Sequence, residues 1–322
     1  MRILLRLLRD WTLPVAICCG IITYLLFANI AVLEPIGRCY APFNGYVIPA
    51  FLFLILFVTF CKVDFHQLRP VRWHLWVSVQ QVLFVCLLVA AIVLLRLHGD
   101  AKIVMESVLA CIIGPCAAAA AVVTAKLGGS LEQMTTYTFL SNIVTAVMIP
   151  VFFPLIEPSA DIQFLSAFLH ILYEVCIVLL VPMAVAFVVK RWMPRFHHFV
   201  VSIKDLSFYL WAVNLAIVSG TTVMNICHSD SGAALLVLIA ALTVVLCLLQ
   251  FATGRLIGRR LGASVEAGQA LGQKNTAFAI WIAAAYLNPL ATVGPGCYIL
   301  WQNIINAIEL WMCRRQGKEH YV

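Results

Sequence analysis

Residues 268–276 read GQALGQKNT and open a hydrophobic stretch that extends to about residue 287. A lysine, an asparagine, a threonine and two glutamines stand in a segment that is otherwise apolar. An ammonium group at bilayer depth costs at least roughly 3 kcal/mol, so it normally faces protein or a water-filled cavity. Gly268 and Gly272 break the helical pattern, and backbone groups freed in this way are tolerated only where they line a cavity or are buried in protein. The stretch predicts a transport site with Lys274 at its centre.

The composition predicts an all-α polytopic membrane protein, because 63% of the 322 residues are hydrophobic and only 11% are charged. A helix needs about 20 residues to cross the hydrocarbon core. Ten apolar segments of about this length cover residues 12–30, 45–61, 73–95, 103–125, 132–156, 163–189, 206–227, 232–253, 265–287 and 295–312. Their short linkers leave no room for a soluble domain. We therefore expect nearly the whole chain to lie in, or directly beside, the lipid bilayer.

The basic residues set the orientation of these segments. Seventeen of the 21 Lys and Arg residues flank one side of the ten segments, three flank the other, and Lys274 belongs to neither set. By the positive-inside rule, both termini are expected in the cytoplasm and the protein in the plasma (inner) membrane. The same rule accounts for the net charge of +7, which gives no reason to expect a nucleic-acid partner.

Ten spans divide into two halves of five, residues 1–160 and 161–322, with opposite topology. Inverted repeats of this kind are a common plan for secondary transporters, and they place unusual segments at matching positions. Span four carries Gly114 and Pro115 in mid-run, and span nine carries Gly268, Gly272 and the polar cluster. Proline removes a backbone donor and kinks a helix. Two broken helices crossing near the midplane are expected, although glycine and proline are also simply frequent in membrane helices.

Three functional roles are open to Lys274. It neutralises a bound organic anion, it titrates as a proton carrier because burial lowers the pKa of a lysine, or it replaces a metal cation as a fixed internal charge. The structural alternative is a salt bridge to Glu174 in span six or Glu309 in span ten. His170 lies one turn before Glu174, and this pair is either a proton relay or a polar contact between helices.

Further polar residues lie in spans three, five, nine and ten. Singly, each is explained by helix–helix hydrogen bonding worth about 0.6 kcal/mol. As a set on converging spans, they are candidates for a substrate or ion site: Gln80, Gln81, Thr138, Asn142, Gln273, Asn275, Thr276 and Asn303. The sequence has no HExxH, G-x-S-x-G or P-loop motif and no metal-ligand spacing among its cysteines. We therefore expect no enzyme activity, no cofactor and no metal centre, and uphill transport would draw on an ion gradient.

The sequence resembles the bile acid:sodium symporter family in the stretch 114–154, in ALGQKN at 270–275 and in WQNI at 301–304. The likeness extends over nearly the whole chain in the number and order of spans. It implies ten helices in two inverted repeats, with a panel domain (spans 1, 2, 6 and 7) facing a core domain (spans 3–5 and 8–10). It also implies that unwound helices four and nine cross in the core. An organic anion would bind between panel and core, and movement of the core would give alternating access.

The ninth helix departs from the family pattern at the residues that matter for sodium. In the family it typically reads Glu-x-Gly-x-Gln-Asn, and its Glu and Gln help to bind sodium. The aligned residues here are Ala270, Gly272, Lys274 and Asn275, so the acid is absent and a lysine stands in place of the glutamine. An ammonium in that pocket would repel a sodium ion.

The other family ligand positions are only partly retained. The fourth helix of the family usually carries Ser-Asn beside the crossover, where this chain has Ala120 and Ala121. Thr138 matches a family hydroxyl on span five, and Gln80 or Gln81 matches a glutamine on span three. Most side-chain ligands for sodium are therefore missing.

The main hypothesis is a secondary transporter of an organic anion, either a bile acid or another small carboxylate or sulfonate. It works by alternating access, without classical two-sodium coupling, and has Lys274 at the helix crossover. Transport is proton-coupled, with His170 and Glu174 as carriers, or facilitative, and sodium stays open as a coupling ion. A cation/proton antiporter of similar fold is the first alternative, weakened by the lack of an aspartate near the crossing. A non-transporting receptor or scaffold is the second, disfavoured by the cost of Lys274.

Overall fold

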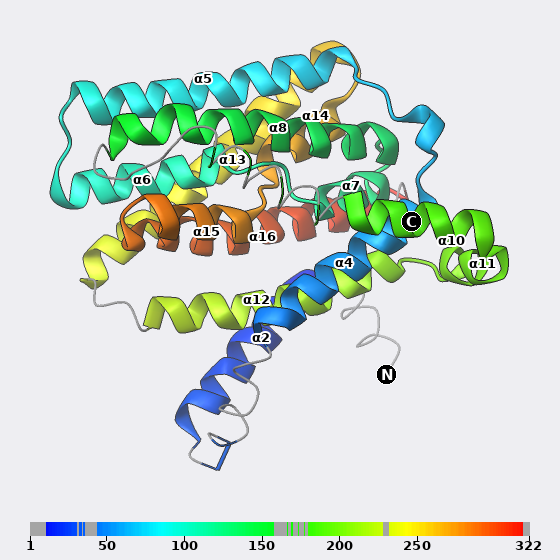
Figure 1. Cartoon of the computed structure of the whole chain (residues 1–322). Helices are drawn as coiled ribbons and strands as arrows, with labels where there is room; N and C mark the ends of the chain where they lie inside the picture. Colours follow the sequence, from blue (N-terminus) through cyan, green and yellow to red (C-terminus); the bar gives the residue numbers. More distant parts are fainter. Residues whose placement is uncertain are drawn as a thin grey trace.

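The computed structural model describes residues 11–30, 44–157, 180–227 and 232–317, with isolated residues 32, 33, 35, 166, 169, 173 and 177. Within these residues the regular structure is helical, and the one β-type contact is an isolated bridge between Cys116 and Lys274. Most of the helices run roughly side by side along one direction (Figure 1). The predicted proton-relay residues, His170 and Glu174, lie outside the described part of the chain.

A smaller bundle comprises α2 (Thr12–Asn29), α4 (Asn44–Lys62), α10 (Val181–Trp192), α11 (Pro194–Ser202) and α12 (Leu206–Cys227). Helix α12 packs along α2 and α4, while α10 and α11 pack on α4. Glycines permit the close approach of α2 and α12: a Cβ on Gly220 would lie 2.9 Å from the carbonyl oxygen of Gly20. Small residues at a crossing let membrane helices pack at short distance.

A larger bundle comprises α5 (Arg72–Leu94), α6 (Gly99–Ile113), α7 (Ala119–Lys126), α8 (Leu131–Ile156), α13 (Ala233–Leu261), α14 (Ser264–Gly272), α15 (Thr276–Tyr286) and α16 (Val293–Arg315). Two 3-10 turns, η2 (Phe65–Gln67) and η4 (Pro289–Thr292), lie in its connections. Its main apolar core joins α5, α6, α8, α13 and α16, and includes Val85, Leu109, Ile149, Cys247 and Tyr298.

Helices α2, α5, α8, α12 and α13 are each long and apolar enough to cross a membrane. The exposure pattern of helix α13 indicates that its outer surface faces lipid. Val237 and Val245 are exposed, whereas Thr243 and Gln250 are buried. An apolar exterior over a polar interior is stable against hydrocarbon and unfavourable against water. The chain is therefore an integral membrane protein.

Two of the predicted spans are interrupted. The segment expected as span four consists of α6 and α7, separated by residues 114–118, and the segment expected as span nine consists of α14 and α15, separated by residues 273–275. Gly114 leaves the helix with an extended ψ of 142°, and Pro115 has no N–H to continue it. Of the predicted segment 163–189, the structure describes a regular helix only in α10.

Candidate functional site

The two interruptions lie against each other in the middle of the larger bundle. The N–H of Ala117 donates to the carbonyl of Gln273 at 3.0 Å, and the N–H of Asn275 donates to the carbonyl of Pro115 at 2.8 Å. These two bonds flank the bridge between Cys116 and Lys274. Each break thus satisfies backbone groups that the other leaves without helical partners, which a hydrocarbon environment requires.

Buried side chains hold the remaining backbone groups of the second break. Gln302 on α16 clamps Lys274: its Oε1 accepts from the backbone N–H at 2.8 Å and its Nε2 donates to the carbonyl at 3.2 Å. The Tyr298 hydroxyl donates to the carbonyl of Gly272 at 2.9 Å and is itself contacted by Nε2 of Gln250 at 3.2 Å. Helix α16 therefore fixes the backbone conformation at Lys274.

The carboxyl end of α6 gathers donors from three other elements. Nε2 of Gln81 on α5 lies 3.2 Å from the carbonyl oxygens of both Ile112 and Gly114, and Thr145 on α8 donates to Ile113 at 2.8 Å. The ammonium of Lys274 donates to the carbonyl of Ile112 at 3.0 Å. A helix C-terminus carries partial negative charge on such carbonyls. A cation is thus bound where the half-helix exposes its negative end.

Among the described residues, no carboxylate forms an ion pair with Lys274. Its side chain has an exposed fraction of 0%. Glu309 is bonded instead to Nε of Arg255 at 3.1 Å and to Gln269 at 2.8 Å, and Glu174 is outside the described residues. Carbonyl dipoles are therefore the groups seen to stabilise the ammonium.

Three alanines that align with family sodium ligands lie in an apolar environment. Ala120, Ala121 and Ala270 are buried in one cluster with the side chains of Tyr137 and Leu271, among others. A methyl group offers no oxygen, and sodium needs oxygen ligands. In this cluster, these three alanine side chains cannot bind a cation.

The other predicted residues fall into two groups. Gln81 reaches the break and is buried, whereas Gln80 is half-buried and has no hydrogen bond at the crossing. Asn275 caps α15 by accepting from the N–H of Phe278 at 3.2 Å. The buried side chain of Thr276 lies in the first turn of the same helix.

On α8, the side chains of Thr138 and Asn142 donate hydrogen bonds to backbone carbonyls of their own helix. The Thr138 hydroxyl donates to the carbonyl of Met134, and Asn142 donates to the carbonyl of Thr138. Two other predicted amides keep buried atoms without partners, namely Nε2 of Gln273 and Oδ1 of Asn303.

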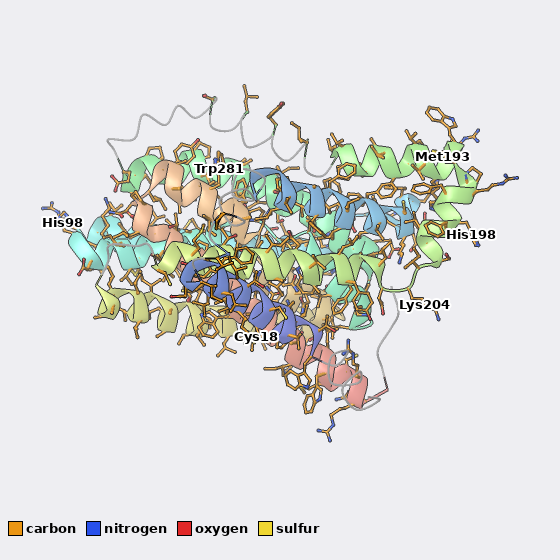
Figure 2. All side chains as sticks on the ribbon, turned by 90° about the horizontal axis from the view of Figure 1, so that it is seen from below. Cys18, His98, Met193, His198, Lys204 and Trp281 are labelled. Atoms are coloured by element: carbon orange, nitrogen blue, oxygen red, sulfur yellow. The ribbon has the colours of Figure 1, made fainter. Side chains whose placement is uncertain are left out.

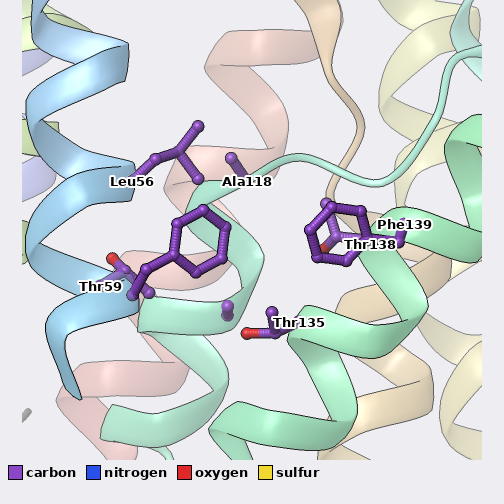
Figure 3. Close-up of a pocket in the computed structure, with 8 residues that line it drawn as sticks. Leu56, Thr59, Ala118, Thr135, Thr138 and Phe139 are labelled. Carbon is purple, nitrogen blue, oxygen red and sulfur yellow. The ribbon is translucent and has the colours of Figure 1, made fainter. Parts of the chain in front are cut away.

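A pocket of roughly 240 Å³, including its mouth, opens between α4 of the smaller bundle and α7 and α8 of the larger one (Figure 3). Its lining includes Thr59, Ala118, Ala121, Thr135 and Thr138. No side chain caps the N-terminus of α7 at Ala118. The Thr135 hydroxyl is buried and unpartnered, and it points from α8 toward α4 and α7. A helix N-terminus with a free hydroxyl suits an anion.

A buried ion pair joins the two bundles at the far end of α7. Nζ of Lys126 lies 2.7 Å from a carboxylate oxygen of Asp205, which precedes α12. The same ammonium sits 4.7 Å from the centre of the Phe208 ring. Asp205 has a left-handed backbone with φ of +58°, a region that aspartate tolerates better than most residues. The pair therefore ties the last turn of α7 to the start of α12.

Sequence reasoning missed several of these contributors. Ser141 accepts from the N–H of Cys116 at 3.0 Å, and Thr145 and Tyr298 bind carbonyls at the breaks. The available signal was their position on spans five and ten, which had been singled out as polar. Their partners are backbone groups, and a sequence does not display where those lie.

A helical membrane bundle whose two interrupted helices meet at a buried charge is the construction of a secondary transporter. The chain belongs to the sodium bile acid symporter family, which matches residues 49–229, more than half of its length. The match begins in α4, ends beyond α12 and includes the first interruption. No curated protein matches the chain. By family inference, it is a symporter-type membrane transporter rather than an enzyme.

Proposed function

We propose that this protein is a secondary transporter of a small organic anion in which the ammonium of Lys274 replaces a coupling cation. The contact between Nζ of Lys274 and the carbonyl of Ile112, 3.0 Å long at the carboxyl end of a half-helix, carries the proposal. Half-helix carboxyl ends and unwound carbonyls are the groups that hold coupling ions in transporters of this construction. A tethered ammonium at this position supplies the same charge permanently.

The substrate side of the proposal rests on the pocket between the bundles. The N-terminus of α7, which no side chain caps, and the buried, unpartnered hydroxyl of Thr135 lie in its wall, although the exposed lining of the pocket is mainly apolar. The roughly 240 Å³ includes the open mouth, and the cavity volume inside is about 10 Å³, room for about one water molecule. The pocket would therefore have to widen before it could receive the carboxylate or sulfonate group of a substrate.

The architecture expected from the sequence is part of this proposal. The smaller bundle corresponds to the proposed panel (spans 1, 2, 6 and 7), and the larger bundle to the proposed core (spans 3–5 and 8–10). The two interruptions fall at equivalent positions in residues 1–160 and 161–322, as inverted repeats of five spans require. Alternating access then consists of movement of the core against the panel, in an inner membrane with both termini cytoplasmic.

Uptake into liposomes that contain the purified protein tests the proposal. Labelled bile acids and small carboxylates and sulfonates are supplied with sodium or choline outside, at several pH values. We expect uptake without sodium, and a loss of at least about tenfold in Lys274→Gln. The double variant Ala270→Glu/Lys274→Gln restores the two ninth-helix residues typical of the family, and any uptake that it regains is expected only with sodium. Arg259→Gln, at an exposed position on α13, is the matched control.

Other outcomes point to the alternatives. Sodium-dependent uptake that survives Lys274→Gln contradicts the proposal and indicates ordinary sodium symport. Exchange of a cation for protons supports an antiporter. A protein that unfolds cooperatively, binds organic anions and moves none of them is a receptor or scaffold.

A further inference from the structure

The corner between α10 and α11 concentrates cations and aromatic side chains at one end of the molecule. Helix α10 ends at Trp192, and α11 begins at Pro194 after the single residue Met193. Met193, His198 and Lys204 lie together at one end, and His98 lies at the opposite end (Figure 2). The direction of the membrane helices puts these two ends on opposite faces of the bilayer.

The corner is built onto the smaller bundle. Val200 is buried in the apolar cluster of α4 and α10, and His197 contacts the carbonyl of Cys61 at 2.9 Å. The ring of Phe196 stacks on that of Phe57, with centroids 6.5 Å apart. One side of α11 is thus fixed to the carboxyl end of α4, and the other side is not covered by any described residue.

Three cations on this corner are exposed: Lys190 and Arg191 in the last turn of α10, and Arg195 in the first turn of α11. In the described part of the chain, none of the three forms an ion pair with a carboxylate. Lys190 makes a cation–π contact instead, with its Nζ 5.9 Å from the centre of the Phe65 ring. No carboxylate in the residues that the structure describes balances their charge.

Large apolar side chains are exposed beside these cations. Trp192 is 74% exposed and Phe199 is 60% exposed, and Met193 lies between the two helices with half of its surface free. Tryptophan is enriched where hydrocarbon meets headgroups. An amphipathic helix with aromatic and cationic side chains lies in that plane. The exposed cations of the corner thus suit the headgroup of a lipid molecule, and the exposed apolar side chains suit its acyl chains.

We propose that the corner binds an anionic phospholipid of the inner leaflet, with its phosphate on Lys190, Arg191 and Arg195 and its acyl chains along Trp192 and Phe199. Charge complementarity selects this occupant: clusters of basic residues beside a membrane span attract anionic headgroups. The lipid anchors the smaller bundle to the leaflet. The inference needs only that the protein lies in a membrane with this corner on the cytoplasmic side, so it stands or falls separately from the transported solute.

Lipid titration of the delipidated full-length protein in neutral detergent tests the inference through the midpoint of thermal unfolding. Phosphatidylglycerol is expected to raise the midpoint at lower concentration than phosphatidylcholine, and soluble glycerol phosphate is expected to have no effect. The triple variant Lys190→Gln/Arg191→Gln/Arg195→Gln is expected to need roughly tenfold to hundredfold more phosphatidylglycerol. Added salt weakens the wild-type response because exposed charges are screened.

The matched control is Arg259→Gln/Arg260→Gln, which removes two exposed cations from the carboxyl end of α13 in the larger bundle. It is expected to respond as the wild type does. An unchanged response of the triple variant, or an equal loss in the control, overturns the inference. If the triple variant does not fold, Arg195→Gln alone is titrated in the same way. A shift of less than about twofold in this single variant also overturns the inference.

Discussion

The ion pair between Lys126 and Asp205 gives the sharpest test of how the two bundles are held together. The Lys126 side chain is 1% exposed and the Asp205 side chain 11%, with 2.7 Å between nitrogen and oxygen. We consider the single variants Lys126→Met and Asp205→Asn and their combination. Asparagine tolerates the left-handed backbone of position 205 as aspartate does. The Asp205→Asn variant therefore changes the charge and leaves the backbone preference in place.

The expected magnitude follows from the burial. Two unit charges 2.7 Å apart attract by about 6 kcal/mol at an effective dielectric constant of about 20, and desolvation of both groups offsets much of this. Removing one partner leaves the other charge buried, which costs about 3–5 kcal/mol. Removing both leaves neither charge buried. The double variant is expected to lose only about 1–2 kcal/mol relative to wild type, so the single losses are far from additive.

A double-mutant cycle measures this non-additivity. Unfolding free energies of the four proteins are determined in one detergent at one pH, and the coupling energy is expected at about 4 kcal/mol or above. The control is Asp64→Asn, an exposed acid whose bonds are to its neighbours His66 and Gln67. It is expected to leave the unfolding free energy nearly unchanged, because the group is exposed to solvent. A coupling energy below about 0.5 kcal/mol for Lys126 and Asp205 would refute the reasoning, because that is the value of a solvated pair.

Two further variants test the packing around the second interruption. Gln302→Leu removes both side-chain bonds to the backbone of Lys274. It is expected to destabilise the protein by roughly 2–4 kcal/mol in denaturant unfolding, because buried backbone groups lose their partners, and a loss under about 1 kcal/mol contradicts the clamp. Gly254→Ala points a methyl group at the carbonyl of Ala267 on α14. It should lower stability by about 1–3 kcal/mol, whereas Gly232→Ala, with no atom within 4 Å, leaves the unfolding midpoint unchanged.

The positions of both helix interruptions were predictable, and the contacts inside them were not. Gly114 with Pro115, and Gly272 with a polar run, are local signals that carry their own physical reason. The choice between Gln80 and Gln81 depended on which side of α5 faces the bundle. That helix is apolar on nearly all sides, so periodicity does not reveal its buried side. Only the three-dimensional arrangement selects Gln81.

Charges were the least predictable feature. Lys126 was counted among the basic residues that set topology, and the structure buries it against Asp205 from a distant part of the chain. Glu309 was considered as a salt-bridge partner of Lys274, and it is bonded instead to Arg255 and Gln269. Counting charges along a sequence reports the side of the membrane on which a residue lies. It carries no information on which partner crosses from another helix.

A tethered cation has a consequence for the energetics of the proposed transport cycle. Sodium ions travel with their substrate and release the energy of their gradient, whereas the ammonium of Lys274 returns with the protein. If Lys274 stays protonated throughout, one cycle moves only the charge of the anion. The membrane potential then acts on a monovalent anion by about 2.3 kcal/mol per 100 mV. This energy corresponds to accumulation of roughly 50-fold on the positive side.

Liposomes clamped with a potassium gradient and valinomycin measure this accumulation directly. With a permanently charged Lys274, the steady-state ratio of a monovalent anion follows the imposed potential and ignores a pH gradient. If Lys274 releases its proton on the return step, a proton accompanies each anion, and the ratio follows the pH gradient and ignores the potential. A ratio that follows the sodium gradient alone would exclude both mechanisms. It would mean that sodium binds elsewhere than at the carbonyls of α6, because the ammonium of Lys274 already occupies the carbonyl of Ile112.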